Sequence, residues 1–133
     1  MSKLTIALLG VAITLAATAQ AHHSFPVHYV PDEMISVTGT VKEFRYVNPH
    51  AVVFLEVKNA SNANEMWKIE WNGAGSLRRR GILPDAMVSG DRVTIDGYPA
   101  RDGSNAMRLN RVSFEDGRAA IGPPVRGTNN NED

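Results

Sequence analysis

Five short segments in which apolar and polar residues alternate constrain the fold of this chain more than any other feature. Turn-forming residues separate them, and we expect strands over 35–47, 50–58, 65–71, 92–98 and 106–115. After the third strand, Ser76 can cap one or two helical turns over 77–80, which Gly81 would end. Three strands, a short helix and two strands is the order of the five-stranded OB-like barrel. The sequence therefore predicts an all-β fold, a small five-stranded OB-like barrel with one short helix between strands 3 and 4.

The first expected strand contains a break in its own alternation. Ile35 and Val41 share one face, whereas Phe44 and Tyr46 are out of step with them. A bulge or a sharp bend within 39–43 would explain the shift, because a strand that bends around a small barrel commonly carries one. We therefore expect an irregularity there.

Residues 1–21 have the features of a secretory signal peptide. Lys3 precedes an apolar run over 4–17, and small residues form the cleavage site Ala19-Gln20-Ala21. The run is shorter than the about 20 residues that a membrane span needs. We therefore expect cleavage and a periplasmic protein without a membrane span; an uncleaved anchor is the alternative.

Cleavage after residue 21 of 133 would leave 112 residues, enough for one domain. We divide them into a histidine-containing arm over 22–34, the barrel over 35–118 and a disordered tail over 119–133. The arm holds two prolines and no periodicity, so no helix is expected in it. The tail is poor in apolar residues, which favours disorder.

Composition excludes several classes of function. The chain has no cysteine, so disulfides, thiolate metal sites and a cysteine nucleophile are excluded. Its formal net charge of zero argues against nucleic-acid binding, which needs a concentrated basic surface. No Gly-x-Ser-x-Gly, phosphate-loop or His-Glu-x-x-His motif is present, so we expect no enzyme; a redox-active copper site is the one enzymatic option.

The histidines carry the sharpest chemical signal. The chain has four, and all fall early in the predicted mature protein: His22, His23, His28 and His50. Cleavage after Ala21 would let His22 offer both its amine and its ring, and His50 or His28 could add an imidazole. His23 could instead coordinate through its ring, the terminal amine and the intervening amide. Such a nitrogen set suits Cu(II) best, with Zn(II) and Ni(II) behind. The ordinary interpretation is a solvated terminus and a turn histidine at position 50.

The loops at one end of the expected barrel form a second candidate site. In the OB-like fold, the loop between the first and second strands and the loop between the fourth and fifth strands frame the usual ligand face. The residues that we expect there are Tyr46, Asn48, Tyr98, Arg101 and Asp102. Simple turn chemistry is the alternative, because Asn48-Pro49 and Asp102-Gly103 also form tight turns.

Two further clusters favour structural roles. Trp67 and Trp71 alternate in phase with Ile69, which indicates core residues rather than a stacking platform for sugars or bases. The run Arg78-Arg79-Arg80 could bind an anion, but a charged run beside a short helix is usually a solvated face.

Six short motifs follow one another over residues 22–118. They are His22-His23-Ser24-Phe25, Gly39-Thr40-Val41, Asn48-Pro49-His50-Ala51, Leu77-Arg78-Arg79-Arg80-Gly81, Gly90-Asp91 and Gly97-Tyr98-Pro99-Ala100-Arg101-Asp102-Gly103-Ser104. In this order they resemble the domain-of-unknown-function 6152 family of small exported bacterial proteins. The chain departs from the pattern at Val52, where a larger residue is usual, and at Ser89, where proline is usual. The resemblance implies a periplasmic β-barrel and brings no established activity.

Two functions therefore stay open. The first is a periplasmic binding module that takes up Cu(II), or secondarily Zn(II), through His22 with His50 and further histidines. The second is an OB-like module whose loop face binds an oligosaccharide, a peptide or a protein partner without metal. The second function predicts that His22→Ala leaves function intact, whereas changes at Tyr98, Arg101 or Tyr46 do not.

Overall fold

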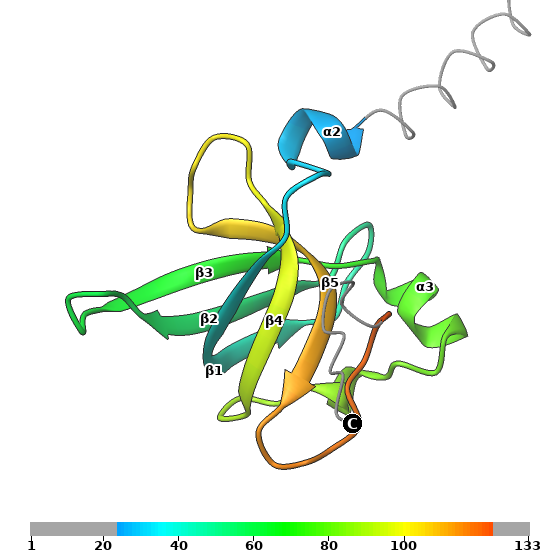
Figure 1. Cartoon of the computed structure of the whole chain (residues 1–133). Coiled ribbons are helices and arrows are strands. Elements are labelled where there is room, and N and C mark those ends of the chain that lie inside the picture. Colours follow the sequence, from blue (N-terminus) through cyan, green and yellow to red (C-terminus); the bar gives the residue numbers. More distant parts are fainter. Residues whose placement is uncertain (1–23, 124–133) are drawn as a thin grey trace, which may run out of the picture.

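The computed structural model describes residues 24–123 (Figure 1). The predicted signal peptide over 1–21, the two histidines His22 and His23, and residues 124–133 lie outside the described part. Among the described residues, no helix has the length and apolar character needed to cross a membrane.

The described chain forms a closed five-stranded β-barrel with strand order β1-β2-β3-β5-β4 (Figure 1). The β3–β5 pair is parallel, and the four other strand pairs are antiparallel. This architecture, with a short helix between β3 and β4, confirms the predicted fold class. The elements are α2 (Ser24–His28), β1 (Ile35–Arg45), β2 (Val52–Lys58), β3 (Asn64–Glu70), α3 (Ala74–Arg79), η1 (Pro84–Ala86), β4 (Arg92–Pro99) and β5 (Ala106–Phe114).

Strand β1 closes the barrel by bending between its two neighbours. Residues 35–40 pair with β4, residues 40–45 pair with β2, and the register shifts between Val41 and Glu43. Gly39 lies at the bend, where an added Cβ would come within 2.3 Å of the Glu56 carbonyl oxygen. No other residue fits so close to the neighbouring backbone. The irregularity that the broken alternation predicted is therefore confirmed.

The barrel interior is apolar and shielded from solvent. Its fully buried side chains are Val41, Val53, Leu55, Ile69, Val93, Ile95, Met107 and Val112. Trp71 is 3% exposed and belongs to this core, whereas Trp67 is half-buried against it. Successive side chains of a strand point to opposite faces, so the inward Ile69 leaves its neighbours Lys68 and Glu70 on the outer face of β3.

Helix α3 begins earlier than expected. It starts at Ala74 after the N-cap Gly73, so Ser76 lies inside the helix and the predicted Ser76 cap is wrong. Position 73 itself requires glycine, because an added Cβ would come within 2.3 Å of the Pro49 carbonyl oxygen. Gly81 has a φ of +76°, which confirms that it ends the helical region.

Two domain-level expectations need correction. Residues 24–28 of the predicted arm form the one-turn helix α2, although no helix was expected there. Pro26 is tolerated because a first helical turn does not use its backbone N–H groups internally. At the other end, Ile121 forms a β-bridge with Val112, so the barrel's packing extends beyond residue 118. The remainder of the predicted tail, 124–133, lies outside the described residues.

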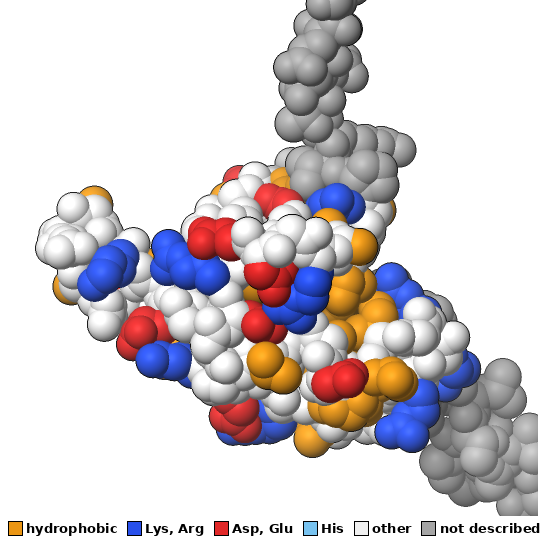
Figure 2. Space-filling model, turned by 90° about the horizontal axis from the view of Figure 1, so that it is seen from below, with side chains coloured by type: hydrophobic (Ala, Val, Ile, Leu, Met, Phe, Trp, Pro, Cys, Tyr) orange, Lys and Arg blue, Asp and Glu red, His pale blue; other side chains and the backbone are white. Residues whose placement is uncertain are grey.

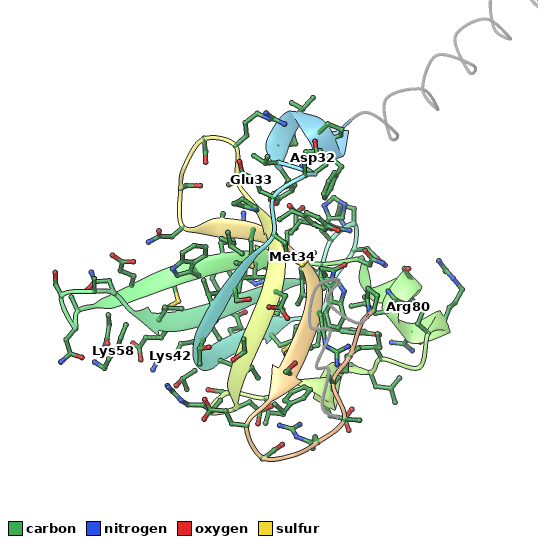
Figure 3. All side chains as sticks on the ribbon, in the orientation of Figure 1. Asp32, Glu33, Met34, Lys42, Lys58 and Arg80 are labelled. Atoms are coloured by element: carbon green, nitrogen blue, oxygen red, sulfur yellow. The ribbon has the colours of Figure 1, made fainter. Side chains whose placement is uncertain are left out.

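Charged side chains are spread over several sides of the barrel. Figure 3 places Lys58 and Lys42 at the side of the barrel opposite α3, whose C-cap residue is Arg80. On the face away from α2, hydrophobic side chains gather beside Lys and Arg side chains (Figure 2). Arg78, Arg79 and Arg80 are exposed. No ion pair joins them to another described residue, which fits a solvated face.

Candidate functional site

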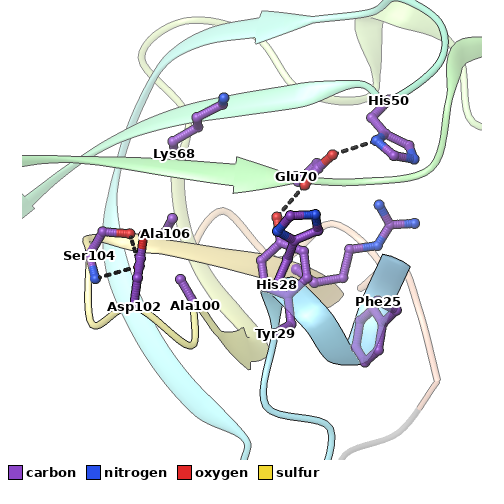
Figure 4. Close-up of a pocket in the computed structure, with 11 residues that line it drawn as sticks. Phe25, His28, Tyr29, His50, Lys68, Glu70, Ala100, Asp102, Ser104 and Ala106 are labelled. Atoms are coloured by element: carbon purple, nitrogen blue, oxygen red, sulfur yellow. Dashed lines mark hydrogen bonds and ion pairs between the residues drawn. The ribbon is translucent and has the colours of Figure 1, made fainter. Parts of the chain in front are cut away.

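A pocket of about 660 Å³ opens at one end of the barrel, beneath α2 (Figure 4). Its walls come from α2, from the loop that leads into β2, from the outer faces of β3 and β5, and from the loop between β4 and β5. The side chains that give it chemical character are His28, Tyr29, His50, Lys68, Glu70 and Arg108. Segments that are distant in the sequence therefore meet at the face that the OB-like fold uses for ligands.

Glu70 is the centre of a hydrogen-bonded network in this pocket. The Tyr29 hydroxyl donates to Glu70 Oε2, and His50 Nδ1 contacts Glu70 Oε1 (Figure 4). The two carboxylate oxygens thus receive one partner from the arm and one from the β1–β2 loop. Because Nδ1 of His50 donates to the carboxylate, Nε2 is the nitrogen that keeps a lone pair for a ligand.

The electrostatics of the network keep Glu70 ionised. Burial raises the pKa of the Glu70 carboxyl, but the hydrogen bond from Tyr29 and the nearby charges of His50 and Arg108 lower the pKa below its ordinary value. Burial raises the pKa of the Tyr29 hydroxyl far above its ordinary value, and the hydrogen bond to Glu70 raises it further. Tyr29 is therefore a proton donor to a carboxylate over the whole physiological range.

Arg108 supplies a fixed positive charge next to this carboxylate. Its Nη1 donates to the Trp71 carbonyl oxygen at 2.9 Å, and its Nη2 donates to Asn72 Oδ1 at 2.5 Å. These bonds hold the guanidinium against the end of β3, where its charge helps to lower the pKa of Glu70. Arg108 thus stabilises the site's carboxylate while its own donors bind the Trp71 carbonyl oxygen and the Asn72 side chain.

Arg101 fastens the arm over the pocket. Its side chain donates to the carbonyl oxygens of Pro26 at 3.0 Å and Tyr29 at 3.2 Å, and its backbone N–H donates to the His28 carbonyl oxygen at 2.8 Å. A β-bridge between Tyr29 and Ala100 continues the attachment. The β4–β5 loop therefore places His28 and Tyr29 at the pocket.

Aromatic packing strengthens the same attachment. The Phe25 ring meets the Tyr98 ring edge-on, with centroids 5.4 Å apart, and lies 5.6 Å from the Tyr29 ring. Such edge-on pairs add about 0.5–1.5 kcal/mol beyond the burial of their area. The short helix α2 thus depends on contacts with the barrel rather than on its own length.

The structure brings together some of the residues predicted for the site. His28, His50 and Asp102 line the pocket. The other ligand candidates hold the scaffold: Tyr46 donates to the Ala74 and Ile82 carbonyl oxygens, Asn48 Oδ1 accepts from the Gly75 N–H, and Tyr98 and Arg101 hold the arm. His22 and His23 lie outside the described residues.

Sequence reasoning missed Tyr29, Lys68, Glu70 and Arg108. The two β3 residues, Lys68 and Glu70, occupy outward positions of an alternating strand, and such positions normally face solvent. Only the docking of α2 turns this part of the strand into a pocket wall. The sequence around Glu70 carries no local signal of the pocket, because its partners Tyr29 and His50 come from distant segments.

Three polar groups in the pocket lack a partner among residues 24–123: His50 Nε2, the His28 ring and Lys68 Nζ. All three are nitrogens. Within the same residues, no group of three or more His, Cys, Asp or Glu side chains is arranged to hold a metal ion. The described pocket can therefore contribute two imidazoles to a metal ion and an ammonium group to an anion.

The comparison with known protein families covers most of the chain. The profile of a family of unknown function, DUF6152, matches residues 11–109, a span that includes all four histidines and Glu70. No curated protein matches the chain. Because the matched span exceeds half of the 133 residues, the chain belongs to the DUF6152 family of unknown function.

Proposed function

We propose that this protein is a periplasmic binding module that takes up Cu(II), or secondarily Zn(II), at the pocket beneath α2. The observation that carries the proposal is the contact between Glu70 and Nδ1 of His50. Histidines that bind metals usually donate their other ring N–H to a carboxylate, which fixes the tautomer and raises the basicity of the metal-binding nitrogen. Glu70 and His50 have this relation, and the Tyr29 hydroxyl orients the carboxylate in turn.

The remaining donors would come from the arm. His28 lines the same pocket as His50, and His22 and His23 directly precede α2 in the sequence. If the signal peptide is cleaved after Ala21, the His22 amine and ring complete an all-nitrogen set. Nitrogen donors without a thiolate suit Cu(II) above other divalent ions. When bound, the ion would supply a Lewis-acid and one-electron centre; binding rather than catalysis is the proposed role.

A Cu(II) titration followed by electron paramagnetic resonance tests the proposal. The protein is purified from the periplasm, and mass spectrometry first establishes whether His22 is the terminus. We expect one equivalent of Cu(II) with nitrogen coupling, loss of that signal in His50→Ala, and weaker binding when an alanine precedes His22. Lys58→Gln is the control, because Lys58 lies on the far hairpin (Figure 3). Unchanged binding in His50→Ala would refute the proposal.

One observation favours the second function, an oligosaccharide-, peptide- or protein-binding module without metal. The pocket volume of about 660 Å³ is in the range of sites for organic ligands and far exceeds the need of an ion. This function predicts ligand binding that survives both a chelator and His22→Ala but is weakened by Asp102→Ala. Nuclear magnetic resonance shifts on titration with a glycan and peptide library would detect it.

A further inference from the structure

Strand β5 is longer than its pairing with β3. Residues 106–108 pair with β3, and β5 then continues to Phe114. On its other side β5 pairs with β4, where Val112 lies opposite Ile95. Beyond the short pairing with β3, no strand of the barrel lies on that side of β5 within residues 24–123. Such an edge presents backbone N–H and C=O groups that an added extended segment can satisfy.

Residues 119–123 cover this edge of β5. The N–H of Val112 donates to the Ile121 carbonyl oxygen, and the N–H of Ile121 donates to the Val112 carbonyl oxygen, both at 2.9 Å. Arg111 Nη1 donates to two further carbonyl oxygens of the segment, at 3.0 and 3.2 Å. The Ile121 side chain packs against the hydrophobic cluster of the barrel. The segment therefore lies beside β5 in the antiparallel sense and is bound mainly through its backbone (Figure 1).

Gly122 makes this fit selective. Its φ is +119°, and an added Cβ would lie 2.3 Å from the Asn110 carbonyl oxygen. The backbone conformation and the contact with β5 therefore both exclude a side chain at this position. Ile121, in contrast, places an apolar side chain against the barrel. The edge thus accepts an apolar residue that is followed directly by glycine.

We propose that this edge of β5 is a strand-addition site for a partner peptide in which an apolar residue precedes glycine. Residues 119–123 are its internal competitor, because they occupy the hydrogen-bonding groups that such a peptide needs. In strand addition, backbone hydrogen bonds supply affinity and side-chain contacts supply specificity. Here Val112 and Arg111 supply the hydrogen bonds, and the contacts at positions 121 and 122 define the specificity. The site shares no residue with the pocket beneath α2 and goes beyond the proposed metal function.

The internal segment determines when the edge is available. A strand that is tethered to its site by a short connection competes at an effective concentration on the order of millimolar. It should therefore mask the edge from a peptide that binds with moderate affinity. Gly122→Val displaces the segment, because the valine Cβ would overlap the β5 backbone, while the edge itself keeps its sequence.

Fluorescence anisotropy with a labelled peptide of the sequence 117–123 provides the test, together with amide hydrogen exchange at Val112. We expect the full-length Gly122→Val variant to bind the peptide at least about tenfold more tightly than the wild type does, because its internal competitor is displaced. Its Val112 amide should exchange faster without the peptide and regain protection with it. A peptide that itself carries the Gly122→Val change should not bind.

Gly103→Val is the matched control, because it places the same side chain at a φ of +76° where an added Cβ would meet no other part of the chain within 4 Å. Ile121→Ser loosens the segment without backbone strain and serves as the second variant if Gly122→Val does not fold. Equal peptide binding by the wild type and the displaced variants would overturn the proposal. A Val112 amide that exchanges faster with no peptide bound would do the same. Dimers in place of the peptide complex would assign the edge to a second copy and would also overturn it.

Discussion

The interior of the barrel and the pocket beneath α2 share strands, but different interactions stabilise the two regions. Inside the barrel, Leu55, Ile69 and Ile95 are fully buried and belong to one hydrophobic cluster. In the pocket, Tyr29, Glu70 and His50 satisfy one another through hydrogen bonds and charge. Adjacent residues of β3 belong to the two regions: Ile69 points inward and Glu70 outward.

The interior therefore determines the stability of the protein, and the pocket determines which groups a ligand can contact. Apolar burial is non-directional and contributes in proportion to area, so the interior determines the free energy of unfolding. The pocket network fixes the orientation of two or three side chains. It depends on the one-turn helix α2, which is attached to the barrel by contacts with the β4–β5 region. We therefore expect substitutions in the two regions to move different measurements.

Ile69→Ala should have the largest effect, and it should fall on stability. Removing a fully buried isoleucine side chain leaves a cavity and costs about 2–5 kcal/mol of unfolding free energy. Urea denaturation measures this loss, while the Cu(II) stoichiometry per folded molecule should stay the same. A similar loss of stability in Glu70→Gln would contradict the conclusion that the interior, and not the pocket, determines the unfolding free energy.

Glu70→Gln should mainly affect the ligand. The variant keeps the shape of the side chain but weakens the group that orients His50 Nδ1 and removes its charge. Loss of such a partner typically lowers metal affinity by about 10–100-fold. Competitive Cu(II) titration measures the change. Wild-type affinity in Glu70→Gln would show that the carboxylate does not orient the metal-binding nitrogen.

Arg101→Ala should loosen the arm with little effect on the barrel. It removes two hydrogen bonds to the carbonyl oxygens of Pro26 and Tyr29, each contributing about 0.5–1.5 kcal/mol. Hydrogen exchange should accelerate over residues 24–30 and stay unchanged in β2. The control is Arg92→Ala, which breaks an exposed ion pair with Glu115. Equal protection of the arm in Arg101→Ala and the wild type would contradict this attachment.

The smallest effect concerns pH. The pKa of Glu70 is lowered in the folded protein from an ordinary value of 4.5. The unfolded chain therefore binds the proton more tightly, and the stability that Glu70 contributes is present above that value. This contribution is lost as the pH falls through the folded-state pKa. The difference in unfolding free energy between wild type and Glu70→Gln should shrink on acidification below pH 4.5, and a growing difference would reverse the assignment.

Sequence alternation was sufficient to predict the barrel, because the inward positions of every strand are apolar and the turns between strands carry Gly, Pro, Asn or Asp. The bend near Gly39 was visible as a shift in phase. Local patterns could not predict α2, since one helical turn has no periodicity and forms only through contacts with Tyr98 and Arg101. For the same reason the sequence could not distinguish Glu70 from an ordinary surface residue, because only the docking of the arm covers it.

Histidine nitrogen resonances can be measured in the 15N-labelled protein by long-range 1H–15N correlation, with Zn(II) as a diamagnetic stand-in for Cu(II). The His50 signals are assigned with His50→Ala. If Glu70 presents His50 to a metal, Nδ1 carries the proton before and after addition, and the Nε2 resonance shifts in proportion to one equivalent of Zn(II). A protonated Nε2 in the free protein, or Zn(II) that leaves both His50 nitrogens unchanged, would contradict the role assigned to this pocket.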